Sequence, residues 1–85
     1  MRVVCVWRRE SDYGRMVEEW IEGFERLTGR EIETINPDTR DGIDFCRAYD
    51  VVEYPTILAL RDDGAVVAAW KGKMLPLFDE VSYWG

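Results

Sequence analysis

The 85-residue sequence contains no histidine, only two cysteines and no long apolar run. The absence of histidine removes the commonest metal ligand and the commonest general base, and two cysteines alone do not complete a zinc site. The longest apolar run, Ala65–Trp70, has six residues, whereas a membrane-spanning helix needs about 20. We therefore expect no metal, no cofactor and no membrane partner.

Basic residues are also scarce, because 11 Lys and Arg stand against 17 Asp and Glu and give a net charge of −6. Nucleic-acid backbones and anionic lipids are bound by clustered Lys and Arg, so neither is an expected partner. The N-terminal residues 1–9 do not follow the signal-peptide pattern, and two cysteines do not indicate a secreted disulfide scaffold. The expected location is cytoplasmic. The length and the 47% hydrophobic content predict one domain over residues 1–85.

Hydrophobic periodicity predicts an α/β chain in the order β-α-β-α-β-β-α. Strands are expected at 2–8, 31–36, 56–60 and 65–71, and helices at about 12–28, 38–50 and 74–84. Ser11 or Asp12 is the expected N-cap of the first helix, and Gly29 is its expected stop. The sequence Asp62-Asp63-Gly64 predicts a hairpin turn between the last two strands. These connections predict a mixed four-stranded sheet with helices on both faces.

Several segments resemble the thioredoxin-like family, and the resemblance covers almost the whole chain. Val4-Cys5-Val6-Trp7 is similar to the strand that leads into the family's active site. Residues 49–56 (Tyr-Asp-Val-Val-Glu-Tyr-Pro-Thr) are similar to the segment that ends in its Pro-Thr turn. Gly64 and Gly72 stand where the family has its hairpin glycine and the glycine after the last strand. The resemblance implies a thioredoxin-like fold whose strands lie in the order second, first, third, fourth.

The cysteines of the family's redox motif are missing from this sequence. In register with the family's Cys-x-x-Cys, the chain has Ser11-Asp12-Tyr13-Gly14. A serine hydroxyl cannot exchange disulfides, and a glycine cannot resolve a mixed disulfide. Cys5 falls where many thioredoxins have a buried acid, and Thr34 falls near where they often have a lysine. We therefore expect a redox-inactive protein that is not an enzyme.

The resemblance also implies a binding groove that does not require cysteine. Its three sides would be formed by Ser11, Asp12, Tyr13 and Gly14, by Glu53, Tyr54 and Pro55, and by Gly72 and Lys73. The Tyr54–Pro55 peptide bond is expected to be cis. Tyr13 and Tyr54 are expected to offer broad, partly apolar contacts to a protein or peptide partner.

Two alternatives to such a binding protein stay open at this point. A divergent thiol-disulfide oxidoreductase would act through a lone cysteine, Cys46 or Cys5, and an assembly subunit would use only the groove or an edge strand. The second and fourth strands are the expected edges, so the chain could be a monomer or a weak homodimer. Cys5 and Cys46 are expected on opposite faces of the sheet, too far apart to form a disulfide.

Overall fold

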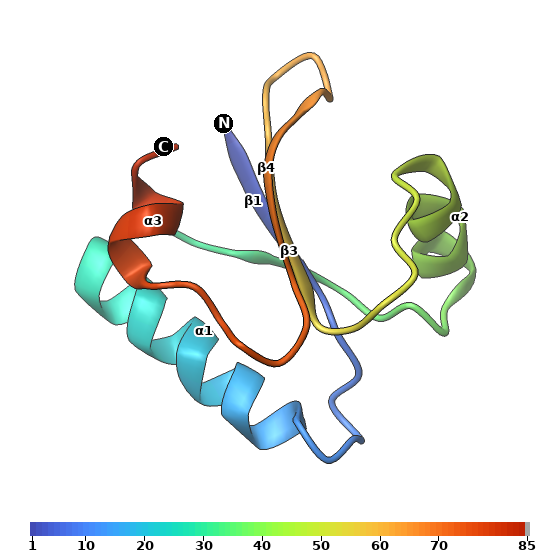
Figure 1. Ribbon diagram of the computed structural model, residues 1–85, viewed down its shortest axis with the longest axis horizontal. Helices are drawn as coiled ribbons and strands as arrows, with labels where there is room; N and C mark the ends of the chain where they lie inside the picture. The colour runs from blue at the N-terminus through green and yellow to red at the C-terminus, as the bar shows by residue number, and fades with distance from the viewer. Residues whose placement is uncertain (85) are drawn as a thin grey trace.

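The computed structural model describes residues 1–84, which form an α/β structure with three helices around a four-stranded sheet (Figure 1). In chain order the elements are β1 (Arg2–Val6), α1 (Gly14–Thr28), β2 (Glu33–Ile35), α2 (Arg40–Ala48), β3 (Thr56–Leu60), β4 (Val66–Lys71) and α3 (Phe78–Ser82). The element order is the one that the periodicity predicts. None of the helices in residues 1–84 has the length and apolar character needed to cross a membrane.

The sheet is mixed, and its strands lie in the order β2-β1-β3-β4, which confirms the expected order. β1 pairs with β2 in parallel, whereas the β1–β3 and β3–β4 pairs are antiparallel. Helices α1 and α3 cover one face of the sheet, and α2 lies on the other (Figure 1). β1 and β3 are therefore the internal strands, and this explains why both read as nearly continuous apolar runs.

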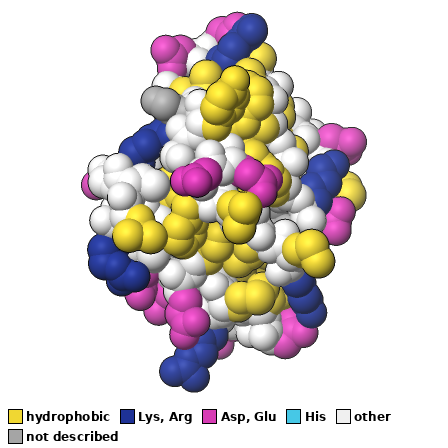
Figure 2. Space-filling model, turned by 60° about the vertical axis from the view of Figure 1, so that its left-hand side comes forward, with side chains coloured by type: hydrophobic (Ala, Val, Ile, Leu, Met, Phe, Trp, Pro, Cys, Tyr) yellow, Lys and Arg dark blue, Asp and Glu magenta, His cyan; other side chains and the backbone are white. Residues whose placement is uncertain are grey.

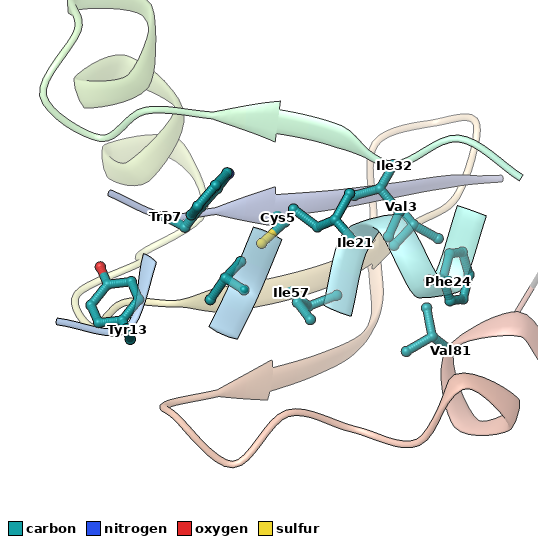
Figure 3. Close-up of a cluster of buried hydrophobic side chains, with 10 residues drawn as sticks. Val3, Cys5, Trp7, Tyr13, Ile21, Phe24, Ile32, Ile57 and Val81 are labelled. Atoms are coloured by element: carbon teal, nitrogen blue, oxygen red, sulfur yellow. The ribbon is translucent and has the colours of Figure 1, made fainter. Parts of the chain in front are cut away.

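Alternate residues of β1 contribute to two separate hydrophobic clusters, one on each face of the sheet. The α1-face cluster consists of Val3, Cys5, Trp7, Tyr13, Val17, Ile21, Phe24, Ile32, Ile57 and Val81 (Figure 3). The α2-face cluster consists of Val4, Val6, Cys46, Val51, Leu58 and Leu60. The division follows from the strand period of two, because successive side chains point to opposite faces.

The start of α1 differs from the expectation. The N-cap is Tyr13, which makes no side-chain capping hydrogen bond, so the prediction of Ser11 or Asp12 as the N-cap is wrong. The Ser11 hydroxyl donates instead to the Arg8 carbonyl oxygen at 2.6 Å, and this holds the loop before the helix. The end of α1 is as predicted, because Gly29 caps it in the left-handed conformation with a φ of 72°.

The last helix is shorter than the expected 74–84. The Trp20 indole N–H donates to the Pro76 carbonyl oxygen at 2.9 Å, and this contact fixes the segment before α3 against α1. Helix α3 therefore begins only at Phe78, whose ring packs against Trp20 and Phe24 at centroid distances of 5.5 and 5.9 Å. A contact across 56 residues of sequence sets this boundary, and local periodicity does not reveal it.

The two edge strands differ in length and in chemistry. β2 has three residues, and the Glu33 carboxylate accepts hydrogen bonds from the Arg2 guanidinium at 2.7 and 3.0 Å. β4 has six residues, of which only Lys71 is charged. Short, charged edges resist pairing with another chain, whereas long, uncharged edges favour it. β4 is therefore the edge at which a further strand can add.

Candidate functional site

The three segments expected to form the groove lie in direct contact. The Lys73 ammonium group pairs with the Asp12 carboxylate at 2.8 Å, which links the loop 11–14 to the residues after β4. The Gly72 N–H donates to the Pro55 carbonyl oxygen at 2.9 Å, which links those residues to the segment before β3. The Lys73–Asp12 contact spans 61 residues of sequence, and the Gly72–Pro55 hydrogen bond closes the shorter connection between β3 and β4.

Glu53 lies where residues 53–55 meet residues 72–73. A Cβ atom placed on Gly72 would lie 3.5 Å from the Glu53 carboxylate, so this side chain packs directly against the glycine. The Glu53 carbonyl oxygen accepts a hydrogen bond from the Thr56 hydroxyl at 2.6 Å, which fixes the backbone as it enters β3. The segment 53–55 is thus held at both ends.

Tyr13 closes the end of the core and does not form an exposed wall. Its side chain is 8% exposed and belongs to the α1-face cluster, at the same end as Trp7 (Figure 3). Its hydroxyl oxygen accepts a hydrogen bond from the Arg8 N–H at 3.3 Å. Of the two tyrosines expected to offer broad contacts, Tyr54 is the more exposed, because it is only partly buried.

Gly14 occupies a position that has no room for a side chain. A Cβ atom there would lie 2.0 Å from the Arg9 carbonyl oxygen and 3.3 Å from the Arg8 carbonyl oxygen. The first overlap is with backbone, which cannot turn aside as a flexible side chain can. A cysteine therefore cannot occupy the last position of the degenerate motif unless the loop before α1 moves.

Tyr54 is the central side chain of the site. Its ring packs against both hydrophobic clusters, and the Arg8 guanidinium lies over it, 4.7 Å from the centroid. Its hydroxyl donates to the Cys46 sulfur at 4.0 Å. Partial burial, and then the hydrogen bond to Cys46, raise the pKa of Tyr54. The Tyr54–Pro55 peptide bond is cis, as expected.

The backbone of Tyr54 belongs to none of the helices and strands of residues 1–84. In residues 1–84, no backbone–backbone hydrogen bond uses its N–H or its carbonyl oxygen. Both neighbours are engaged, because the Glu53 carbonyl accepts from Thr56 and the Pro55 carbonyl accepts from Gly72. One donor and one acceptor on this partly exposed residue thus have no backbone partner among residues 1–84, and water or an external chain can pair with them.

The two cysteines lie on opposite sides of the sheet, and both are free thiols. Cys5 is fully buried, and burial raises the pKa of its thiol to about 12. At neutral pH this thiol stays protonated, and the protonated form is not the nucleophile in disulfide exchange. Cys46 is 9% exposed and lies under the Tyr54 hydroxyl. Neither sulfur belongs to the loop 11–14.

Arg8 and Asp38 also frame the site, although the sequence prediction did not include them. The Arg8 guanidinium binds the Asp38 carboxylate through two nitrogens, at 2.9 and 3.0 Å. This hydrogen bonding lowers the pKa of Asp38, and the Lys73 ammonium lowers the pKa of Asp12 in the same way. The sequence did contain a signal, because Arg8 ends one predicted strand, Asp38 follows another, and the carboxyl ends of parallel neighbours must meet.

No group of three or more Cys, Asp or Glu side chains within residues 1–84 is arranged to hold a metal ion. Comparison with protein-family models and with curated proteins finds no match to this sequence. The contacts around Tyr54 and the loop 11–14 are therefore the observations from which a function can be argued.

Proposed function

We propose that this chain is a redox-inactive protein of thioredoxin-like fold that binds an extended segment of a peptide or protein in the groove beside Pro55. The strand order β2-β1-β3-β4 and the helices on both faces support the fold assignment. The contacts that link the loop 11–14, residues 53–55 and residues 72–73 support a single groove at one end of the sheet.

The unpaired backbone of Tyr54 is the observation on which the binding proposal depends. Backbone N–H and C=O groups need hydrogen-bond partners, and those of Tyr54 are engaged by no other backbone group among residues 1–84. A peptide in extended conformation presents a carbonyl and an N–H on the same side and would satisfy both groups, as in strand addition to a sheet edge. The Tyr54 ring would then provide the apolar contact area beside the main-chain bonds.

The loss of redox function is supported by three separate features of the site. The Ser11 hydroxyl is engaged by the Arg8 carbonyl, position 14 has no room for a thiol, and the Cys5 thiol stays protonated. The proposed location is cytoplasmic; the free state of the two cysteines follows from their places on opposite faces of the sheet.

Backbone substitution tests the groove directly. A random peptide library displayed on phage would first be selected against the chain to obtain binding peptides. Replacing the amide N–H of Tyr54 with an ester oxygen, by chemical synthesis, removes one hydrogen-bond donor and keeps every side chain. We expect this change to weaken binding of the selected peptides about tenfold, the loss that corresponds to one good hydrogen bond.

Two controls accompany the ester. The same ester at exposed Asp62, in the β3–β4 hairpin, should leave binding unchanged. Ser11→Ala should also leave binding within about twofold, because the Ser11 hydroxyl is already bonded internally. Selected peptides whose affinity is the same for the Tyr54 ester and the unmodified chain would show that the groove is not their site.

The alternative of a lone-cysteine oxidoreductase is tested separately. Insulin reduction with dithiothreitol as the electron source should proceed no faster with the chain than without it. Turnover that is lost in Cys46→Ser and kept in Cys5→Ser would contradict the proposed loss of redox function and identify Cys46 as the reactive thiol.

A further inference from the structure

A second surface, separate from the groove, lies between the free edge of β4 and α3. It is a hollow of about 600 Å³. β4 contributes Ala68, Ala69 and Trp70 to its lining, and α3 with the two residues after it contributes Asp79, Glu80, Tyr83 and Trp84. Figure 2 shows the side of the molecule that carries α1 and α3, where hydrophobic side chains gather across the middle with acidic side chains among them.

The ladder between β3 and β4 determines which backbone groups of β4 face outward. The Gly72 N–H donates to Pro55, so the next hydrogen-bonded pairs along the register are Ile57–Trp70 and Ala59–Ala68. Hydrogen-bonded and non-hydrogen-bonded pairs alternate in an antiparallel ladder. The N–H and C=O groups of Ala69 and Lys71 therefore point away from β3, toward the free side of the edge.

The side chains of an added strand would alternate between the two faces of the sheet. Those on the α1 face would enter the hollow beside Trp70, which packs against the α1-face cluster. The small side chains of Ala68 and Ala69 leave the backbone of the edge accessible. The hollow thus provides space for side chains at every second position of an incoming segment.

The carboxylates of Asp79 and Glu80 make the hollow negative. Neither takes part in the ion pairs formed by residues 1–84, and the Glu80 carboxylate accepts a long hydrogen bond from the Leu77 N–H at 3.5 Å. Tyr83 is 79% exposed, and its ring meets that of Trp84 edge to face at 5.2 Å. Aromatic faces beside carboxylates attract a Lys or Arg side chain by ion pairing and by cation–π contact together.

We propose that β4 binds a second kind of partner, an extended basic segment of a protein that adds to the sheet as a fifth strand. The backbone groups of Ala69 and Lys71 would pair with the main chain of this segment. Lys or Arg side chains at alternate positions would enter the hollow and meet Asp79 and Glu80. This proposal does not depend on the groove beside Pro55.

Charge also decides against a second copy of this chain as the occupant. In an antiparallel β4–β4 pair, the side chains directed into the hollow would be Ala68 and Trp70 of the other copy, because Lys71 points to the opposite face. Asp79 and Glu80 would then be covered without a counter-charge. Each copy also has a net charge of −6, which opposes self-association.

The experiment uses a labelled peptide of alternating lysine and threonine, about eight residues long, with binding measured by fluorescence anisotropy. A matched peptide of alternating glutamate and threonine should not bind. A lysine–threonine peptide that is N-methylated at alternate residues, on the hydrogen-bonding side, keeps its charge but cannot pair as a strand. We expect it to bind at least about tenfold more weakly than the unmethylated peptide.

Variants of the chain identify the surface. The double variant D79N/E80Q should weaken binding about tenfold. The control E22Q/D44N, which neutralises two exposed acids on other helices, should change it less than twofold. Ala69→Pro removes an outward N–H and should abolish binding without breaking the β3–β4 ladder. If circular dichroism shows that the Ala69→Pro variant is unfolded, hydrogen exchange in the unmodified chain serves as the test. Exchange of the Ala69 and Lys71 backbone amides should then slow when the peptide binds.

Four results would overturn the proposal. Equal binding of the N-methylated peptide, or an equal effect of E22Q/D44N, would show that the attraction is charge alone without strand addition. Peptide binding that slows no amide of β4 would place the peptide elsewhere. A dimer in light scattering that Ala69→Pro converts to a monomer would identify a second copy as the occupant of this edge.

Discussion

The two faces of the sheet differ in how much core they bury and in what they leave accessible. The α1 face is covered by two helices and buries the larger cluster, which includes Phe24 and Cys5. The α2 face is covered by one short helix and buries a smaller cluster with fewer large side chains. Tyr54 packs against both clusters at the end of the sheet where we propose the peptide groove. The comparison suggests that the α1 face supplies most of the stability.

A matched pair of phenylalanine substitutions tests this division and has the largest expected effect. Phe24→Ala should lower the free energy of unfolding by about 4 kcal/mol, because Phe24 is fully buried and stacks on Trp20 at 5.4 Å. Phe45→Ala on the α2 face should cost only about 1–2 kcal/mol, because Phe45 is half-buried. Urea unfolding measures both. Equal costs would contradict the assignment of stability to the α1 face.

The next effect concerns the point where the loop 11–14 joins the α1 face. Gly14→Ala should lower the free energy of unfolding by about 3 kcal/mol, because its methyl group would overlap the Arg9 carbonyl. Gly29→Ala is the control: space is free around Gly29, and only its left-handed conformation resists a side chain. It should cost about 1 kcal/mol. A fully stable Gly14→Ala variant would mean that the loop readily moves and that position 14 can accept a side chain.

Alkaline titration distinguishes the buried thiol of the α1 face from the rest of the chain. Because the pKa of folded Cys5 is raised to about 12 from 9.0, its contribution is fully present below pH 9 and is lost as the pH rises toward 12. Relative to Cys5→Ala, the unmodified chain should therefore lose up to ~1.4 kcal/mol per pH unit above pH 9. Chemical unfolding at pH 7, 9 and 10.5 measures the difference. A constant difference would show that Cys5 reaches solvent.

The smallest effect is expected at the β2 edge. The Arg2 hydrogen bonds lower the pKa of Glu33, so this pair stabilises the fold above the ordinary Glu pKa of 4.5 and is lost as the pH falls through the lowered value. Both side chains are about half exposed, and solvent screening limits the cost of Glu33→Gln to ~0.5 kcal/mol at pH 7. Thermal unfolding at pH 7 and pH 3 should show the two chains converging in acid. A cost that persists at pH 3 would point to packing instead of charge.

The parts of the fold that the sequence predicts are those set by local pattern. The strand at 56–60 and the Gly29 stop are found where they were expected, because a continuous apolar run and a C-cap glycine are local signals. The N-cap of α1 and the start of α3 were not predictable in this way. The Ser11 hydroxyl has a competing acceptor three residues away, the Arg8 carbonyl, and the start of α3 is set by the Trp20–Pro76 contact across 56 residues.

The same distinction applies to the two candidate sites. The resemblance to the family motifs predicted which segments would form the groove. It could not predict the burial of Tyr13 or the unpaired backbone of Tyr54, because these depend on packing and hydrogen bonding in the folded chain. The hollow beside β4 was not predicted, because it depends on where α3 ends and on the rings of Tyr83 and Trp84. The redox and binding proposals stay predictions until the experiments above are done.

The unequal edges of the sheet have a consequence for the size of any complex. β2 is three residues long and its Glu33 is held by Arg2, whereas β4 is long and mostly uncharged. Unlimited growth of a fibril by strand addition requires two receptive edges on every unit, so that each newcomer can recruit the next. Among residues 1–84 the sheet offers one receptive edge, β4. Strand addition should therefore stop after one partner has bound, which gives a complex of fixed size and protects the chain from amyloid-like stacking.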